Sequence, residues 1–365
     1  MRQPDVPLGE RSYKVVIEHG LLDRIDTHLA PLARGGRLVV VSDETVWACQ
    51  GERFLKGLGR LDSSPIILPP GEASKDWTTL IGLVDRLLEL GVERADHLVA
   101  FGGGMIGDLA GFAAAILKRG CSYVQVPTSL LAQVDSSVGG KTAINTSQGK
   151  NLVGAFHQPA AVLIDPTTLD TLPERQVQAG YAEVVKYGLI GDPAFFAWCE
   201  AHGEALMAGH AAARLHAIET SVRAKAAIVA EDERETAGRR ALLNFGHTFA
   251  HALEAETDFS DRLLHGEAVA LGMALAFRFS AERGLCSGAD ADRVAAHLES
   301  AGLPTTLAAA GVETDGDRLA AHMESDKKRA SGRLPFILAR GIGAAFVDES
   351  VSIEEVRDFL DRETG

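Results

Sequence analysis

The chain has few cysteines, and none of them are close together in sequence. Four cysteines occur among 365 residues, and no C-x-x-C pair exists. This pattern excludes a disulfide framework and a cysteine zinc site as organising features. It is typical of a reducing compartment, so we expect a cytoplasmic protein. The four positions are Cys49, Cys121, Cys199 and Cys286.

The sequence also has no run rich in Lys and Arg, and its formal net charge is −14. We therefore expect neither a nucleic acid nor an anionic membrane surface as a partner. The acidic composition is compatible with a small anionic substrate, because a local basic pocket can form inside an acidic protein. No uncharged apolar run is long enough to span a bilayer, and residues 1–20 contain no apolar signal-peptide core.

Short apolar runs alternate with helical patterns over the first half of the chain. Residues 37–43 (RLVVVSD) and the runs within 63–76, 96–104, 122–129 and 160–166 have the composition of strands, while 77–94 has helical spacing. This alternation predicts a parallel α/β sheet, a Rossmann-like nucleotide-binding domain over residues 1–172. From 173 to 365 the chain is rich in Ala, Glu, Leu and Arg, and segments 211–235 and 265–284 indicate a mostly α-helical second domain.

Three consecutive glycines follow the apolar start of the stretch VAFGGGMIGDLAGF at residues 99–112. Gly102, Gly104 and Gly107 match G-x-G-x-x-G between a strand and a helix, where backbone N–H groups suit a pyrophosphate. The match alone is weak, since such glycines are often only steric. A standard unit would place a ribose-binding acid ~20 residues further on, but residues 122–132 contain none. Asp43, at the end of an earlier strand, is the candidate acid, which predicts a variant nucleotide fold.

Three separate segments carry polar residues among apolar neighbours. His247 and His251 are four apart, which places both rings on one face of a helix. A single helical histidine is more often a surface or core residue, but a His/His/Glu set with an open position is typical of catalytic zinc. Spacing alone favours His247 and His251 as the paired ligands. The other two segments contribute His265 with Glu267, and Glu183 with Lys186.

Residues 133–156 form a polar segment with many small residues, which we expect to be rich in loops. Two glycine-lysine steps, at Lys141 and Lys150, suit an anion, because small residues allow close approach and ammonium groups neutralise phosphate. The alternative is a solvated connector. The charges of 225–244 are mostly typical of surface pairs, with one or two turned toward the histidines that follow, and Lys327 with Lys328 is typical of a solvated surface.

Taken together, these segments resemble the 3-dehydroquinate synthase family of sugar phosphate cyclases. The matching stretches occur in the family's order, and they are PPGEASK, GGGMIGDLAGF, VPTSLLAQVDSSVGGKTAINTSQGKNLVGAFHQP, AEVVKYG, DERETAGRRALLNFGHTFAHALEAE, LLHGEAVALGM and DKK. The resemblance implies a homodimeric lyase of the shikimate pathway that uses NAD and Zn²⁺ or Co²⁺. Such an enzyme converts 3-deoxy-D-arabino-heptulosonate 7-phosphate (DAHP) into 3-dehydroquinate and phosphate.

The resemblance also assigns roles to individual residues. It implies Glu183, His247 and His265 as metal ligands, so His251 belongs to the substrate pocket. For NAD it implies Asp43, Glu72, Lys75, Gly103, Gly104, Met105, Ile106, Gly107, Asp108, Thr128, Ser129, Lys141, Lys150, Thr168, Leu169, Asp170 and Thr171. For substrate it implies Asp135, Lys141, Lys150, Asn151, Lys186, Lys225, Arg240, Asn244, His251 and a lysine of DKK, taken as Lys328. Arg119 resembles a residue that family members pass to the partner subunit's phosphate site.

Three alternatives share parts of this pattern. Another sugar phosphate cyclase, acting on a neutral heptulose or hexose phosphate, would lack the carboxylate-binding set of Arg240, Asn244 and Lys225. A polyol or glycerol-phosphate dehydrogenase of the same architecture would produce NADH and release no phosphate. A non-catalytic NAD-binding protein would not need Glu183 or Lys186.

Overall fold

The computed structural model describes residues 1–236, 238–329 and 336–364. By their internal contacts, residues 1–173 with 214–234 form one compact unit, and residues 174–213 with 235–365 form a second. The predicted division placed all residues after 172 in one domain, so segment 214–234 groups differently from that prediction. No helix among the described residues is long and apolar enough to cross a membrane.

Ion pairs explain why residues 214–234 group with the first unit. This segment comprises most of helix α7 (Ala211–Glu231). Arg214 contacts Asp170 at 2.5 Å, and Lys225 binds the carboxylate of Asp135. Helical periodicity along α7 could not reveal these partners, because they lie between 44 and 90 residues earlier in the chain.

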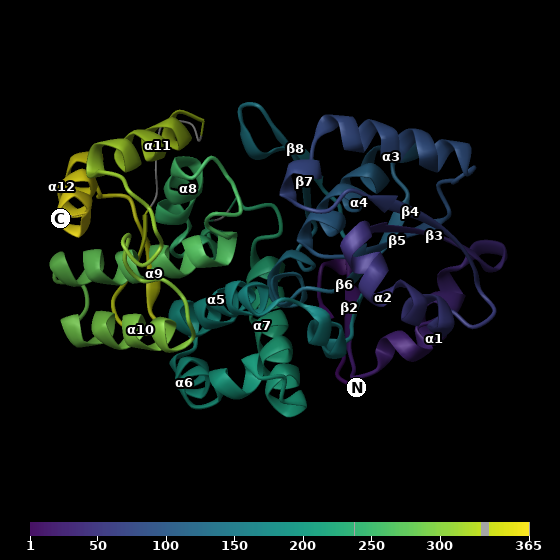
Figure 1. Cartoon of the computed structure of the whole chain (residues 1–365), viewed down its shortest axis with the longest axis horizontal. Coiled ribbons are helices and arrows are strands. Elements are labelled where there is room, and N and C mark those ends of the chain that lie inside the picture. The colour runs from purple at the N-terminus through teal and green to yellow at the C-terminus, as the bar shows by residue number, and fades with distance from the viewer. Residues whose placement is uncertain (237, 330–335, 365) are drawn as a thin grey trace. The chain divides into compact units, whose positions relative to one another are not determined.

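A mainly parallel sheet forms the centre of the first unit (Figure 1). Among the described residues its strands follow the order β1-β2-β9-β6-β5-β3-β4, and only the short edge strand β1 is antiparallel. The predicted parallel sheet is therefore confirmed, with β1 and β2 as additional strands. The strands are β1 (Asp5–Val6), β2 (Tyr13–Ile17), β3 (Arg37–Asp43), β4 (Asp62–Leu68), β5 (His97–Gly102), β6 (Ser122–Pro127) and β9 (Ala161–Ile164).

Helices cover both faces of this sheet, because successive strand residues point to opposite sides. In β3, Val39 and Val41 join one apolar core, while Leu38 and Val40 join the other. The first core includes residues of α3 and α4, and the second includes Phe54 of α2. The helices of this unit are α1 (Asp26–Leu29), α2 (Glu44–Gly57), α3 (Trp77–Glu89), α4 (Gly104–Ile116) and the main part of α7.

An antiparallel hairpin occupies the segment that was expected to be loop-rich. Strands β7 (Lys141–Thr146) and β8 (Gly149–Phe156) pair from Lys141 with Phe156 to Thr146 with Gly149. The loop prediction is therefore wrong for these residues. Thr142 packs so closely on α4 that a Cβ on Gly111 would lie 2.5 Å from its Cγ2 atom. The hairpin is thus stabilised by tertiary packing that its polar sequence does not predict.

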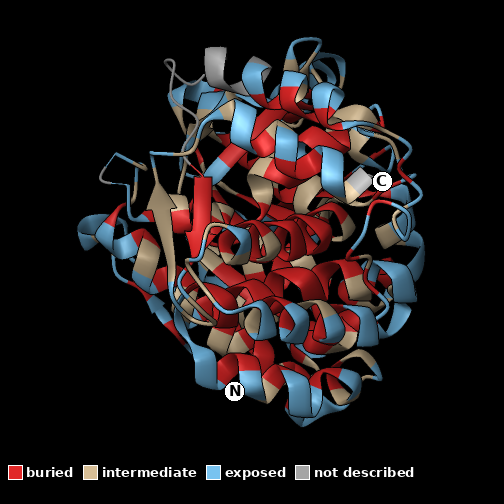
Figure 2. Ribbon diagram, turned by 90° about the vertical axis from the view of Figure 1, so that its left-hand side faces the viewer, coloured by how far each residue is buried: buried red, intermediate tan, exposed pale blue. Residues whose placement is uncertain are grey.

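The second unit is mostly helical, as predicted, and helix α9 packs against α5, α8, α10 and β10. Figure 2 faces this unit and shows its inner helices buried and its outer helices partly exposed. A small antiparallel pair, β10 (Phe336–Ala339) with β11 (Ala345–Asp348), was not predicted. The helices are α5 (Glu174–Gly191), α6 (Pro193–Met207), α8 (His247–Glu256), α9 (His265–Glu282), α10 (Gly288–Ser300), α11 (Gly316–Arg329) and α12 (Ile353–Thr364).

Candidate cofactor and metal sites

The glycine turn lies at the carboxyl end of β5, next to the carboxyl end of β3. These strands are parallel neighbours, with Val41 opposite Ala100, so Asp43 and Gly102 lie at the same edge of the sheet. From β3 the chain moves to β4 on one side and then crosses to β5 on the other. Ligands of open α/β sheets bind outside the strand ends at such a reversal. The sequence places Asp43 and the glycines far apart, and the fold brings them together.

Two glycines of the turn, Gly102 and Gly107, have a steric reason. A Cβ on Gly102 would lie 2.7 Å from Ile106, and one on Gly107 would lie 2.5 Å from the Gln125 amide oxygen of β6. Gly107 thus lets helix α4 pack closely on the sheet, while Gly103 forms the amino-terminal cap of that helix. The exposed N–H groups of the first turn make this helix end suitable for a pyrophosphate.

Asp43 ends strand β3 and also begins helix α2. Its Oδ1 atom accepts a hydrogen bond from the Val46 amide at 2.9 Å, the usual role of an N-cap residue. The side chain is therefore held at the sheet edge where the predicted ribose-binding acid is needed.

Lys75 is the centre of a polar network beside the glycine turn. Its buried ammonium lies 2.5 Å from Asp108 on α4, 2.6 Å from Asn151 and 3.7 Å from Glu72. Burial opposes the charged form, but the carboxylates of Asp108 and Glu72 outweigh it and raise the pKa of Lys75. The network thus brings together three residues predicted to bind NAD and one predicted to bind substrate: Glu72, Lys75 and Asp108, with Asn151.

The remaining predicted cofactor residues lie on α4, just after β6 and in residues 168–171. Ile106 and Leu169 are buried in the apolar core. Thr128 is buried at the end of β6, and Ser129 lies over Gly103. Residues 168–171 lie in a short 3₁₀ helix, Pro166–Thr171, where Asp170 pairs with Arg214.

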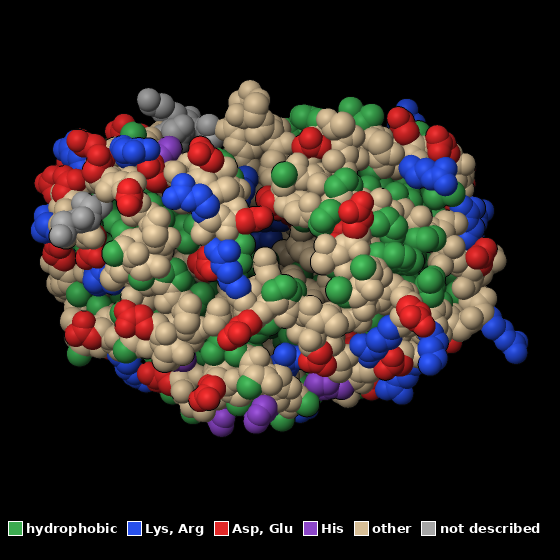
Figure 3. Space-filling model, in the orientation of Figure 1, with side chains coloured by type: hydrophobic (Ala, Val, Ile, Leu, Met, Phe, Trp, Pro, Cys, Tyr) green, Lys and Arg blue, Asp and Glu red, His purple; other side chains and the backbone are tan. Residues whose placement is uncertain are grey.

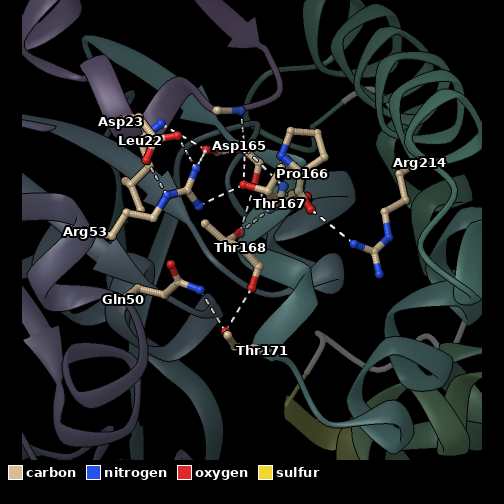
Figure 4. A network of polar contacts seen from close by, with 12 residues as sticks. Leu22, Asp23, Gln50, Arg53, Asp165, Pro166, Thr167, Thr168, Thr171 and Arg214 are labelled. Atoms are coloured by element: carbon tan, nitrogen blue, oxygen red, sulfur yellow. Dashed lines mark hydrogen bonds and ion pairs between the residues drawn. The ribbon is translucent and has the colours of Figure 1, made fainter.

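A buried hub at Asp165 fixes this 3₁₀ helix (Figure 4). The carboxylate accepts hydrogen bonds from the amides of Gly20 and Leu22 at 3.0 and 2.9 Å, and from Arg53 at 3.0 Å. Gln50 donates to Thr171 at 2.8 Å. The hub holds the threonine segment at the carboxyl end of β9, the edge that also carries the glycine turn.

The predicted substrate residues of the first unit lie on several different elements. Asp135 lies in a single π-helical turn, Ala132–Ser136, and Lys225 donates to both its carboxylate and its carbonyl group. Such turns are frequent at functional sites. Lys141 is exposed at the start of β7, and Lys150 is half-buried in β8. Arg119 is exposed and has a positive φ of 64° in the loop after α4.

The second unit brings Glu183, His247 and His265 together from three helices. Each offers one ligand atom, and these atoms lie within 4.8 Å of one another. The Nε2 atoms of His247 and His265 are 3.6 and 3.7 Å from Glu183 Oε1. Within the described residues, this is the one cluster of His, Cys, Asp or Glu that could hold a metal ion.

Close backbone packing makes this convergence possible. Gly266 follows His265, and a Cβ at Gly266 would lie 1.9 Å from the Ala179 carbonyl of α5. Gly246 precedes His247 with a positive φ of 81°, and a Cβ on Gly272 of α9 would lie 2.1 Å from its carbonyl oxygen. Helix α9 can approach α5 and α8 this closely only because these positions have no side chains.

Both histidines are oriented through Nδ1, which leaves Nε2 facing the carboxylate. His247 Nδ1 lies 3.2 Å from the Phe245 carbonyl oxygen, and His265 Nδ1 lies 3.3 Å from Glu254 Oε1. Metal-binding histidines usually make such a bond with their other nitrogen. The donor set of two imidazoles and one carboxylate therefore fits a divalent cation such as zinc.

Local electrostatics keep His247 ready to bind a cation. Burial, together with the Lys186 ammonium and the rings of His265 and His251, holds the pKa of His247 well below its usual value. The imidazole is therefore neutral near pH 7, as a metal ligand must be. Lys186 contacts the other oxygen of Glu183, Oε2. The two oxygens of Glu183 thus face different partners.

The other predicted substrate residues of this unit lie on nearby elements. The His251 ring is 5.7 Å from that of His247, but it does not join the ligand cluster that spacing alone suggested. Arg240 is buried at 2% exposure, whereas Arg239 is exposed. Arg240 and Asn244 occupy one 3₁₀ turn, Arg240–Asn244. Lys328 belongs to α11, but its side chain lies outside the described part of the structure.

Two supports of the metal cluster were missed from the sequence. Glu254 was quoted within the motif but was assigned no role, although its spacing of seven from His247 places both on one helix face. Arg175 binds both carboxylate oxygens of Glu267 at 2.6 and 2.7 Å and donates to the carbonyls of residues 261 and 262. Glu267 also accepts from the Leu264 amide. This clamp fixes the backbone immediately before His265.

Charged side chains of both signs are interspersed on the face of the protein shown in Figure 3. The sequence carries an excess of acidic residues, with a formal net charge of −14.

Comparisons with known proteins agree on one family. The family model described as 3-dehydroquinate synthase N-terminal matches residues 65–179, and the model described as 3-dehydroquinate synthase C-terminal matches residues 180–329. The chain is similar to the 3-dehydroquinate synthase of Zymomonas mobilis, with 59% identity over 358 residues, 98% of this chain and 94% of that protein.

Solved structures of two sugar phosphate cyclases are also similar. One is 2-epi-5-epi-valiolone synthase from Streptomyces hygroscopicus with NAD⁺ and Zn²⁺ bound, at a TM-score of 0.88 and 30% identity over 95% of each chain. The other is 2-deoxy-scyllo-inosose synthase with carbaglucose-6-phosphate, NAD⁺ and Co²⁺, at a TM-score of 0.86 and 26% identity, covering 99% of this chain and all of that one.

Proposed function

The chain belongs to the 3-dehydroquinate synthase family, and from this premise we propose that it converts DAHP into 3-dehydroquinate and phosphate. The observation that carries the proposal is 59% identity to a synthase of that name over 98% of the chain. The reaction is a carbon–oxygen lyase step of the shikimate pathway. It has no net redox change, because one hydride leaves the substrate and returns within a turnover.

We propose that the first unit binds NAD at the sheet edge formed by Asp43 and the glycine turn. A bound nicotinamide supplies the acceptor and donor for the returning hydride. The chain's own residues hold the dinucleotide: the amino-terminal turn of α4 faces the pyrophosphate, and Asp43 accepts a hydrogen bond from a ribose hydroxyl group. Glu72 and Lys75 line the adjacent loop. The bound NAD⁺ of two similar cyclases supports this assignment.

In the second unit we propose that Glu183, His247 and His265 hold Zn²⁺ or Co²⁺. A cation held there would polarise a substrate hydroxyl and favour loss of its proton. Glu254 and the Phe245 carbonyl keep the two imidazoles turned toward it. The neutral state of His247 near pH 7 leaves its ring nitrogen available for binding.

The remaining predicted residues match the charges of the substrate. Arg240 grips the carboxylate through a planar fork that a lysine does not reproduce. Lys141, Asn151 and His251 neutralise the phosphate, whose departure develops negative charge. The phosphate itself accepts the proton lost in the elimination, so no dedicated carboxylate base is needed. Asp135 is paired with Lys225 and orients that lysine.

We further propose that the active form is a homodimer. Leu152 and Phe156 lie four residues apart on one face of β8, and these residues are 49% and 47% exposed. Ile116, at the end of α4, is 46% exposed and lies three residues before Arg119. A second copy that covered these apolar side chains would bury Arg119 at the interface. Sedimentation of the purified protein tests this part separately.

A product assay tests the proposed reaction. Purified protein is incubated with DAHP, a catalytic amount of NAD and Zn²⁺ or Co²⁺. We expect phosphate release matched by dehydroquinate, with no accumulation of NADH. Parallel reactions contain a neutral heptulose phosphate or a hexose phosphate in place of DAHP. Turnover of either one, with DAHP inert, would assign the chain to another cyclase reaction, and stoichiometric NADH would indicate a dehydrogenase.

A further inference from the structure

Asn145 lies where the cofactor loop meets the hairpin that carries predicted substrate residues. We propose that it is a positioning residue, which couples NAD binding at Glu72 and Lys75 to the placement of Asn151. The inference rests on the proposed function and names a residue to which neither the sequence motifs nor the resemblance gave a role.

Three hydrogen bonds fix Asn145 between the two segments. Its backbone amide donates to the Lys75 carbonyl at 2.7 Å. Its side-chain amide donates to Glu72 Oε1 at 2.8 Å, and its side-chain carbonyl accepts from the Asn151 backbone amide at 3.0 Å. Lys75 closes the ring by donating from Nζ to Asn151 Oδ1 at 2.6 Å. The loop and the hairpin are therefore joined by a closed set of bonds.

The amide side chain of Asn145 satisfies both of its partners. The Glu72 carboxylate can only accept, and the Asn151 backbone N–H can only donate, so the side chain between them must do both. Asparagine has one donor group and one acceptor group at the required spacing. Aspartate would keep the acceptor but would place a second carboxylate beside Glu72.

The backbone of the hairpin is adapted to this arrangement. The pairing of β7 with β8 shifts register between the pair Ile144 with Val153 and the pair Thr146 with Gly149, so Asn145 lies opposite extra residues of β8, Asn151 among them. Bulges re-aim a side chain and are frequent next to active sites. Asn151 has a positive φ of 56°, which a residue with a Cβ adopts at a cost in conformational energy. The hydrogen bond from its amide to Asn145 holds it in that conformation.

Binding of a dinucleotide should affect the placement of Asn151. A dinucleotide that contacts Glu72 or Lys75 stabilises the bonded arrangement of the loop, and Asn145 transmits that restraint to Asn151. Asn151 is then already placed when the phosphorylated substrate arrives. Loss of Asn145 should therefore weaken both ligands, although we assign it contact with neither.

Two variants separate the two side-chain hydrogen bonds of Asn145. Asn145→Ala removes both side-chain bonds, and we expect the Kd for NAD and the KM for DAHP at saturating NAD each to rise about tenfold. Asn145→Asp keeps the acceptor for Asn151 and loses the donor to Glu72. For this variant we expect a similar or larger rise in the Kd for NAD and a KM for DAHP within about threefold of wild type. Calorimetry gives the first constant and phosphate release gives the second.

The control is Gln148→Ala, an exposed side chain in the turn of the same hairpin, which should leave both constants unchanged. Thermal unfolding of the ligand-free proteins checks that all variants fold. The proposal is overturned if Asn145→Ala leaves both constants within about twofold of wild type, or if the two variants change both constants alike, as a general packing defect would. A wild-type protein that binds NAD but does not turn over DAHP would refute the proposed function. The Kd values of the variants for NAD would still test the link between Asn145 and Glu72.

Discussion

Replacement of Glu254 tests the metal centre without removing any of its predicted ligands. Glu254 is buried at 3% exposure on α8, and its Oε1 atom lies 3.3 Å from His265 Nδ1. His265 itself is 36% exposed, and its ring also packs edge-on against the His247 ring at 5.3 Å. We expect Glu254→Ala to weaken Zn²⁺ binding, because the ring loses the acceptor that turns Nε2 toward Glu183.

The size of this effect follows from the strength of one hydrogen bond. A hydrogen bond to a charged group contributes about 1.5–3 kcal/mol, which corresponds to about 10- to 100-fold in affinity. The observed 3.3 Å is longer than the 2.7–2.9 Å of a tight charge-assisted bond. We therefore expect about a tenfold loss for Glu254→Ala. Glu254→Gln keeps an acceptor oxygen and should lose less.

The assay is competition between metal-free protein and a chromophoric chelator for Zn²⁺. The absorption spectrum of the Co²⁺ form gives a second readout, because it reports the coordination geometry. Glu256→Ala is the matched control: Glu256 is a buried carboxylate two residues later, but it pairs with Arg318 at 2.6 Å and His322 at 3.1 Å. If Glu254→Ala held Zn²⁺ as tightly as the wild type, the reasoning from ring orientation would be refuted.

Three further changes have expected outcomes. Arg240→Lys should raise the KM for DAHP more than it lowers kcat, because the bidentate grip on the carboxylate is lost; steady-state kinetics measures this, and an unchanged KM would remove Arg240 from the site. Asp165→Ala should lower the free energy of unfolding by about 2–4 kcal/mol, because the amides of Gly20 and Leu22 lose their acceptor while Arg53 keeps its ion pair with Asp23; chemical denaturation measures this, and a loss below about 1 kcal/mol would contradict it. Burial lowers the pKa of His247 and His297, so both rings bind protons more readily in the unfolded chain than in the folded chain. Metal-free protein should therefore lose stability as the pH falls below about 6.5. A urea midpoint that stayed constant or rose between about pH 7.5 and pH 5.5 would show that these rings are not held neutral.

Local patterns in the sequence predicted many of the individual elements correctly. The run at 37–43 is strand β3, the run at 122–129 contains β6, and the segments at 211–235 and 265–284 contain α7 and α9. Their apolar periodicity reflects which face each element buries, and that information is local. Strand β2 and the pair β10–β11 were missed.

The assignment of ligand partners shows where local information ends. Four-residue spacing singled out His247 with His251, and only the family resemblance pointed to His265. In the structure, His265 joins Glu183 and His247 because Gly266 and Gly272 let α9 pack against α5 and α8. Helical spacing predicts which residues share a face. It does not predict which faces of different helices meet.

The sequence by itself therefore determined the class of each half and the glycine turn, and the resemblance supplied the set of residues predicted to carry the chemistry. Tertiary structure decided which of them meet: the Glu183 cluster, the Lys75 network and the hydrogen bonds of Asn145. The physical reason is that these contacts join segments distant in the chain. They depend on close backbone packing and on bulged or left-handed backbone, which no local periodicity encodes.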